Sequence, residues 1–367
     1  MTARALAGPG WPLTLWGYLL REFGRALLLA LGGFLLVYLC VDFLERAPRF
    51  VQAGATAMQI VRYFLLKIPL IVTQMIPVAV LAGTLLSFGA LSRHAEIMAM
   101  RSSGLSLTGI SAPILATALT LSVGTFAWNE WVVPQAAERA HHLEQVEITK
   151  KKFAGHFRRS AIWYRSGSGF VNIDWFDEST ATLHGVRVLE LTDSYRLRRL
   201  LTAPRLRWSG EAWGGEGAFE VDFTKAGSDR VKPLSTVSLA ETPEDFAAVA
   251  RKPEDLTSRE LARQIADLDS KGLDTTEMSV DLWLKSAVPF VSVIMALIGV
   301  PLASRSRRNT SAAANMAAAI AVGFGYWIVL ALSISLGRTG VIPPWAAAWG
   351  ANALFLGVGL VLYLSSE

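Results

Sequence analysis

The chain has 367 residues, of which 52% are hydrophobic and only 18% are charged, whereas an average soluble chain carries about 25% charge. Of the 65 charged residues, 47 lie between Glu130 and Lys285, so two apolar ends enclose one polar middle. This distribution predicts a membrane protein with a water-facing insert. The net charge of +5 does not indicate nucleic-acid binding, because the basic residues outside the middle flank apolar runs. The single Cys40 excludes a disulfide or a multi-cysteine zinc site within the chain.

Six apolar runs are long enough to cross a hydrocarbon core, which takes about 20 helical residues. They span residues 26–44, 68–91, 105–128, 286–304, 310–336 and 345–364. Apolar runs of about 10–14 residues are typical of buried core helices, so six longer runs favour transmembrane helices. No small-residue cleavage pattern follows the first run, and we therefore expect it to stay as a span rather than to be removed as a signal peptide.

Lysine and arginine residues in the short connections predict the orientation, because cytoplasmic connections carry more of them. One side would hold eight, at positions 4, 21, 25, 93, 101, 305, 307 and 308. The other side would hold five, at positions 46, 49, 62, 67 and 338. We therefore expect both termini in the cytoplasm and the polar middle outside it.

The polar middle alternates between apolar and polar residues over positions 162–237 and is interrupted by glycine and serine turns. Aromatic and β-branched residues at a period of two predict short antiparallel strands. Arg165–Phe170, with the sequence RSGSGF, has the pattern of a hairpin turn. We expect a sandwich or jelly roll. The predicted fold is an α-helical membrane protein with six transmembrane helices and an extracytoplasmic antiparallel β-jellyroll-like domain between the third and fourth.

Two segments connect this β domain to the spans. Residues 130–152 are rich in Ala, Glu and Lys and predict a helical continuation of the third span. Thr257–Glu260 has the pattern of a capping box for a second helix, which Gly272 would end. One face of that helix would carry Leu261, Ile265 and Leu268. The expected domains are residues 1–130 with three spans, 131–281 with the β domain and its linkers, and 282–367 with three more spans.

The chain lacks the sequence motifs of common catalytic sites. It has no G-x-x-x-x-G-K-S/T phosphate loop, no H-E-x-x-H zinc motif and no G-x-S-x-G nucleophile elbow. His141 and His142 are adjacent, which places them on different faces of a helix and favours surface positions over metal ligands. We therefore expect a non-catalytic protein without a metal or cofactor.

The stretch at about residues 92–104, between the second and third spans, is the most informative part of the sequence. It is amphipathic and cytoplasmic by the charge pattern, and it predicts a short helix that docks in a groove on a partner. One acid, two bases and three adaptable apolar side chains are its candidate contacts: Arg93, Glu96, Ile97, Met98, Met100 and Arg101. The alternative is an interfacial helix that lies on lipid.

The same stretch, LSRHAEIMAMRSSGLSL, resembles the coupling helix of the LptF/LptG family of lipopolysaccharide-export permeases. Three further segments resemble the family in the same order. They are RYFLLKIPLIVTQMIPVAVLAGTLLSFG with Pro69 and Pro77, NEWVVPQ at 129–135, and LWLKSAVP at 282–289, which runs into GVP at 299–301. The resemblance covers nearly the whole chain, and EWVVPQ at 130–135 is closer to the LptG branch than to the LptF branch.

The resemblance implies a permease subunit of an ABC transporter in the bacterial inner membrane, which extracts lipopolysaccharide and passes it to the periplasmic bridge. ATP hydrolysis then belongs to two copies of a separate ATPase, LptB, that dock on the coupling helices. The other implied partners are the sister permease LptF, the single-span LptC, and periplasmic LptA, reached through the β domain. We accordingly expect Glu96 to meet a basic or polar group in the ATPase groove, with Ile97, Met98 and Met100 filling apolar space.

Moving such a lipid requires an apolar cavity for its acyl chains and cations for its phosphates. The candidate lipid-phosphate ligands are Arg46 and Arg49 after the first span and Lys67 at the start of the second. The resemblance places Arg46 near a basic position implicated in lipid A contact, whereas Glu45 stands where some relatives are basic. From the residues alone, anchoring in lipid headgroups is the alternative. Asp42 is expected to pair with Arg46, four residues on.

Other classes stay open from the residues. A lipoprotein-release permease shares the membrane setting, but it usually has four spans and a large domain after the first. A membrane-embedded enzyme needs a catalytic set that the sequence lacks. Within the family, the sister subunit LptF is the alternative. Co-purification with an ATPase and a sister permease distinguishes these classes.

Overall fold

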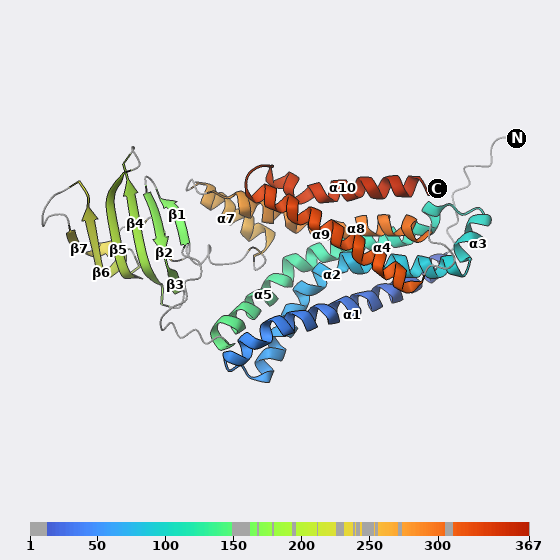
Figure 1. Ribbon diagram of the computed structural model, residues 1–367, viewed down its shortest axis with the longest axis horizontal. Coiled ribbons are helices and arrows are strands. Elements are labelled where there is room, and N and C mark those ends of the chain that lie inside the picture. The colour runs from blue at the N-terminus through green and yellow to red at the C-terminus, as the bar shows by residue number, and fades with distance from the viewer. Residues whose placement is uncertain are drawn as a thin grey trace. The chain divides into compact units, whose positions relative to one another are not determined.

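The computed structural model describes residues 13–148, 162–166, 169–177, 180–192, 196–210, 212–224, 231–237, 239, 243, 253, 256–270, 274–304 and 311–366. The chain divides into two compact units (Figure 1). One unit is helical and combines the two ends of the chain. The other contains the β-strands.

Six helices of the helical unit are long and apolar enough to cross a membrane. They are α1 (Leu13–Gln52), α2 (Ala57–Arg93), α4 (Leu107–Trp131), α8 (Thr276–Ser304), α9 (Ala312–Arg338) and α10 (Pro344–Leu364). Each overlaps one apolar run of the sequence, which confirms the six predicted spans. The 40 residues of α1 give a helix of roughly 60 Å, about twice the thickness of a hydrocarbon core. Helix α1 therefore continues beyond its apolar run.

Helix α8 lies at the centre of the helical unit. Buried residues make up 72% of its most apolar window, against 11% for α1 and 22% for α9. Gly299 lets α8 approach α2 closely, because a Cβ atom at this position would lie 2.9 Å from Cβ of Thr84. Small residues at such crossings allow helix backbones to pack tightly in lipid. In contrast, α1 and α9 keep most of their apolar side chains on the outside of the unit.

Buried amide and hydroxyl groups connect the last three helices. The Asn352 side chain donates to the carbonyl of Ala287 at 2.8 Å and accepts a hydrogen bond from the Tyr326 hydroxyl at 2.7 Å. These two bonds join α8, α9 and α10. The hydroxyls of Ser111 and Tyr363, 2.6 Å apart, likewise join the start of α4 to the end of α10. Because polar groups inside a membrane bundle require partners, these bonds fix which helix faces meet.

The predicted helical linkers are confirmed over the described residues. Helix α5 (Val133–His142) and the π-helical segment η1 (Leu143–Ile148) continue α4, while residues 149–152 lie outside the described part. The second linker, α7 (Ser258–Ser270), begins with the predicted capping box. The Thr257 amide donates to the Glu260 carboxylate at 2.8 Å, and the Glu260 amide donates to the Thr257 hydroxyl at 3.2 Å. Leu261 is fully buried, whereas Gly272 lies outside the described residues.

The β-strands lie in the sequence between α4 and α8, as predicted. They are β1 (Ile162–Ser166), β2 (Gly169–Ile173), β3 (Trp175–Asp177), β4 (Thr182–Leu191), β5 (Leu197–Trp208), β6 (Trp213–Asp222) and β7 (Val231–Val237). These strands form one antiparallel sheet with the order β1-β2-β4-β5-β6-β7, and β3 pairs with β4. The predicted hairpin is confirmed, since Arg165 pairs with Phe170 and Ser166 with Gly169.

Two neighbouring strands, β4 and β5, change their alternation at one level of the sheet. Leu183 and Val186 in β4 are both buried, as are Ala203 and Leu206 in β5, although residues three apart lie on opposite faces of a regular strand. Gly185 lies between the two buried residues of β4. In the pairing of β4 with β5 it stands opposite the residue that follows Ala203. Gly185 has a φ of +65°, which an L side chain rarely adopts. This glycine allows the strand to turn so that both of its halves face the apolar core.

Replacing Gly185 by alanine is expected to destabilise the sheet by about 2–4 kcal/mol. The alanine would have to adopt a φ that is strained for an L residue, and its Cβ atom would overlap the carboxylate of Asp174. Hydrogen exchange of the β4 and β5 amides in the full-length protein measures the effect.

The control is the Asp174→Ala, Gly185→Ala double variant. Asp174 makes an exposed ion pair with Arg187 at 3.3 Å, which contributes little by itself. Removing the Asp174 carboxylate should therefore recover most of the loss that comes from overlap, although the Cβ atom at this position, 2.8 Å away, remains. Equal exchange in the single and double variants would contradict the overlap.

Candidate functional site

The segment between α2 and α4 folds into a turn and the short helix α3 (Glu96–Ser102). This helix is shorter than the predicted one, because residues 92 and 93 belong to α2 and Ala95 interrupts the helix with a left-handed φ of +61°. At the other end Gly104, with a φ of +93°, follows the last turn. Left-handed backbone is unfavourable for residues other than glycine and is frequent at functional turns. The structure therefore corrects the predicted helix of about 92–104 to seven residues.

The apolar side chains of α3 divide between the core and the surface. Ile97 is buried in the main apolar core, and Met100 packs against that core. Met98 is 67% exposed. The amphipathic pattern of the sequence did not distinguish these positions. Ile97 therefore holds α3 against the rest of the chain, and Met98 is the large apolar side chain that α3 presents outward.

The charged side chains of this segment make contacts within the chain. Glu96 accepts a hydrogen bond of 2.9 Å from the hydroxyl of Tyr18, near the start of α1. Arg101, at the end of α3, is exposed and donates to the backbone carbonyl of Ser366 at 3.4 Å. Arg93 is partly buried at the end of α2. We call residues 94–102 the α3 turn. The start of α1, the α3 turn and the C-terminal residues thus meet at one end of the helical unit.

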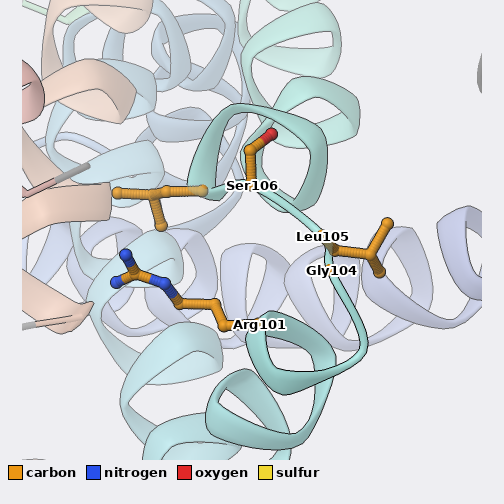
Figure 2. Close-up of a pocket in the computed structure, with 5 residues that line it drawn as sticks. Arg101, Gly104, Leu105 and Ser106 are labelled. Carbon is orange, nitrogen blue, oxygen red and sulfur yellow. The ribbon is translucent and has the colours of Figure 1, made fainter. Parts of the chain in front are cut away.

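An open hollow of about 470 Å³ adjoins α3 and is lined by Arg101, Gly104, Leu105, Ser106 and Leu107. Figure 2 shows the Arg101 guanidinium and the Leu105 side chain pointing to opposite sides of the connecting loop. Ser106 begins α4 by accepting a hydrogen bond of 3.1 Å from the amide of Gly109. The loop that carries these residues is thereby fixed at both ends, by α3 and by the cap of α4.

Replacing Tyr18 by phenylalanine is expected to loosen the α3 turn without unfolding the helices. The ring stays in place while the hydrogen bond to Glu96 is lost, which costs about 0.5–1 kcal/mol at an exposed position. Hydrogen exchange at the amides of residues 96–102 should be several-fold faster than in the parent. Tyr18→Ala, which also removes the ring, is the larger truncation for comparison. If exchange of these amides in Tyr18→Phe equals that of the parent, the hydroxyl has no stabilising role.

A second cluster lies where the end of α1 meets the start of α2, which we call the charge cluster: Asp42, Arg46, Tyr63, Lys67 and Glu144. Lys67 Nζ donates to both carboxylate oxygens of Asp42, at 2.7 and 2.6 Å, and Arg46 Nε donates to the same carboxylate at 3.0 Å. The predicted pairing of Asp42 with Arg46 is therefore confirmed. The cluster is roughly 40 Å along α2 from the α3 turn.

Glu144 brings the linker η1 into this cluster. Its carboxylate accepts a hydrogen bond from Arg46 Nη1 at 3.1 Å and another from the Tyr63 hydroxyl at 3.3 Å. The Tyr63 ring lies 5.6 Å from the Arg46 guanidinium and 5.9 Å from the Lys67 ammonium, within the range of cation–π attraction. Below these groups, an apolar cluster of Phe50, Tyr63, Ala140, Leu143 and Ile148 packs the linker against α1 and α2.

The structure thus unites two of the three predicted phosphate ligands, Arg46 and Lys67, and places carboxylates beside both. Arg49 and Glu45 lie on the exposed surface of α1. Nothing in the sequence pattern indicates Tyr63 or Glu144 as members of the site. Glu144 is 98 residues from Arg46, and no spacing rule connects positions so far apart.

The second linker is attached to the helical unit through Glu130. The Glu130 carboxylate accepts from the backbone amide of Ser258, at 3.1 and 3.0 Å, and so supports the first turn of α7. Lys285 of α8 donates to the carbonyl of Leu256 at 2.7 Å. Both residues belong to segments whose sequences resemble the LptF/LptG family, NEWVVPQ and LWLKSAVP. Their contacts show how these segments hold the start of α7.

Comparison with known proteins agrees with this architecture. The family model for "Lipopolysaccharide export system permease LptF/LptG" matches residues 17–365. The lipopolysaccharide export system permease protein LptG of Escherichia coli strain K12 is 24% identical over 332 residues, which cover 88% of this chain and 90% of that protein. LptG of Haemophilus influenzae is also 24% identical, over 343 residues that cover 90% and 93%. The chain therefore belongs to the LptF/LptG family of lipopolysaccharide export system permeases.

Proposed function

We propose that the protein is the LptG-type permease subunit of an ATP-driven transporter that extracts lipopolysaccharide from the bacterial inner membrane. The observation that carries this proposal is the family match over residues 17–365, which takes in all six spans and the β domain. The two relatives that match about nine-tenths of the chain are both named LptG, and these names favour LptG over the sister subunit LptF.

In this proposal the chain is non-catalytic and a separate ATPase supplies the energy. Two copies of LptB dock on the permease pair that this chain forms with LptF. LptC contributes one further span, and the β domain passes lipopolysaccharide to periplasmic LptA. Both termini face the cytoplasm and the β domain faces the periplasm. The meeting of α3, the start of α1 and the C-terminal residues at one end of the helical unit supports a common cytoplasmic face.

The ATPase contact is assigned to the α3 turn. Glu96, Met98 and Arg101 supply an acid, an exposed apolar side chain and a base on seven residues, and Arg93 adds a base at the end of α2. Ile97 and Met100 take part through their packing in the core, which holds α3 in place. A short helix fixed on one side and exposed on the other is suited to a groove on a partner.

The lipid-phosphate contact is assigned to Arg46 and Lys67, with Arg49 on the neighbouring surface of α1. Guanidinium and ammonium groups form charge-assisted hydrogen bonds with phosphate. Both cations of the cluster lie within 6 Å of the centre of the Tyr63 ring, and Asp42 fixes their positions through three hydrogen bonds. The cations are therefore oriented before a lipid arrives, which lowers the ordering cost of binding.

The test is a reconstituted complex of this chain with its sister permease and ATPase in nanodiscs. ATP hydrolysis should rise severalfold with lipopolysaccharide and not with a phospholipid or a triacylated lipoprotein. Stimulation by lipoprotein alone would favour a lipoprotein-release permease. Assembly only with a partner that is itself LptG-type would identify the chain as the LptF-type subunit.

A further inference from the structure

Arg46 forms ion pairs with two carboxylates, and the two differ in how readily they can be displaced. Asp42 is nearly enclosed, with 9% of its side chain exposed, and it accepts hydrogen bonds from both Lys67 and Arg46. Glu144 has 28% of its side chain exposed and accepts one hydrogen bond from the Arg46 cation and one from the neutral Tyr63 hydroxyl. A buried carboxylate with several partners is costly to remove, whereas a partly exposed ion pair exchanges readily. Of the two partners of Arg46, Glu144 is the replaceable one.

Glu144 also belongs to an unusual part of the chain. It lies in the π-helical segment η1, which leads from α5 towards the β domain. π-Helical turns are rare and are frequently found at functional sites. Leu143 and Ile148 on the same segment pack against Phe50 and Tyr63. The ion pair between Arg46 and Glu144 therefore also attaches the linker to the α1–α2 pair.

We propose that Glu144 is an internal substitute for a phosphate group: a phosphate-bearing lipid headgroup displaces it from Arg46 and thereby frees the linker from α1 and α2. This inference rests on the proposed function, because it concerns the same lipid-phosphate site. The inference assigns the selectivity of the site to Glu144. It also connects headgroup binding to a change in the β-domain linker.

The chemistry of the exchange favours phosphate over a carboxylate. A phosphate monoester carries about −1.5 to −2 charge at neutral pH, whereas Glu144 carries a single charge. Guanidinium binds phosphate through two parallel N–H···O bonds, whereas Glu144 takes a single bond from Arg46. The Tyr63 hydroxyl, which donates to Glu144 at 3.3 Å, can donate to a phosphate oxygen instead. Asp42 stays in place and keeps Arg46 and Lys67 aligned during the exchange.

The first measurement is binding of lipid A to the full complex in nanodiscs, compared with lipid A stripped of its phosphates. Glu144→Gln retains the shape of the side chain and removes its charge. It should bind phosphorylated lipid A about three- to tenfold more tightly than the parent, with no change for the stripped lipid. Glu138→Gln removes an exposed carboxylate of the preceding helix α5 and should match the parent with both lipids. Arg46→Gln should lose the preference for phosphorylated lipid.

The second measurement follows the linker by the distance between two spin labels. Cys40→Ser removes the native thiol, and Met58→Cys and His142→Cys place labels on exposed positions at the start of α2 and the end of α5. Lipid A should lengthen or broaden the distance in the parent. Glu144→Gln should show that longer distance without lipid, and Glu138→Gln should not.

The outcomes separate this inference from the proposed function. If Glu144→Gln binds both lipids as the parent does and its label distance is unchanged, the inference is wrong even where lipopolysaccharide stimulates ATP hydrolysis. If the complex shows no such stimulation, the proposed function fails, and the label distance of Glu144→Gln without lipid still decides whether Glu144 holds the linker. Inorganic phosphate at millimolar concentration distinguishes the ligand: the same distance change would show that free phosphate suffices and would overturn the lipid headgroup as the displacing group.

Discussion

Replacing Glu96 by lysine is expected to lower lipopolysaccharide-stimulated ATP hydrolysis of the reconstituted complex at least about tenfold, since losing one buried charge contact at an interface costs 2 kcal/mol or more. The change reverses the charge at the first residue of α3 and removes the acceptor of the Tyr18 hydrogen bond. Ile97 and the core beneath it are untouched, so the helices themselves should remain folded. The measurement is ATPase activity together with the amount of ATPase that co-purifies.

Two control variants separate the loss of the Glu96 acid from the loss of its internal hydrogen bond and from a general effect of charge reversal. Tyr18→Phe breaks the same internal hydrogen bond but keeps the acid, and it should retain most of the stimulated activity. Glu22→Lys reverses a charge one turn further along α1, where Glu22 pairs with Arg25 at 3.1 Å, and should have little effect. A Glu96→Lys variant that co-purifies with the ATPase and hydrolyses ATP like the parent would contradict the assignment of Glu96.

Replacing Asp42 by leucine is expected to destabilise the helical unit by about 3–5 kcal/mol, the cost of leaving a buried charge without its partner. Only 9% of the Asp42 side chain and 13% of the Lys67 side chain is exposed. Lys67 would lose both of its hydrogen bonds to Asp42, and Arg46 would keep only Glu144 of the two carboxylates. Denaturant unfolding of the purified chain, followed by tryptophan fluorescence, measures the loss.

The Asp42→Leu, Lys67→Met double variant is the matched control. Replacing a buried ion pair by apolar residues of similar volume is often close to neutral. The double variant should therefore recover most of the stability that Asp42→Leu loses. If the single variant unfolds at the same denaturant concentration as the parent, the cluster does not stabilise the bundle.

The sequence predicted the parts of the fold that depend on local pattern. Six long apolar runs predicted six helices, because a helix can cross a hydrocarbon core where about 20 consecutive residues are apolar and nearly uncharged. The RSGSGF hairpin and the Thr257–Glu260 capping box were predictable for the same reason, since each depends on residues only a few positions apart. In these regions local propensity and the final fold agree.

The candidate sites were only partly predictable. The sequence identified Glu96 and the Arg46–Asp42 pair, yet it did not show that Ile97 turns into the core or that Ala95 interrupts the helix. Glu144 with Arg46, and Glu130 with Ser258, are contacts across 98 and 128 residues. Such contacts follow from how linkers fold back on the spans, which no local pattern encodes.

The charge cluster changes how the basic residues are interpreted. Seen in the sequence, Arg46 and Lys67 are two cations near a membrane surface, with headgroup anchoring as the simplest role. In the structure they share Asp42 and lie close to the Tyr63 ring, and Arg46 also meets the β-domain linker at Glu144. This arrangement favours a defined binding position over loose anchoring.

The membrane sidedness of α3 and of the β domain decides whether the chain can be a permease driven by an ATPase from the cytoplasm. In a Cys40→Ser background, single cysteines at Met98 and at Phe219 of β6, both exposed side chains, are treated with a maleimide that cannot cross the inner membrane. If the β domain is periplasmic and α3 is cytoplasmic, Phe219→Cys is labelled in spheroplasts and Met98→Cys only after the membrane is opened. Labelling of both cysteines in intact spheroplasts would place the two segments on one side and contradict a permease driven by an ATPase from the cytoplasm.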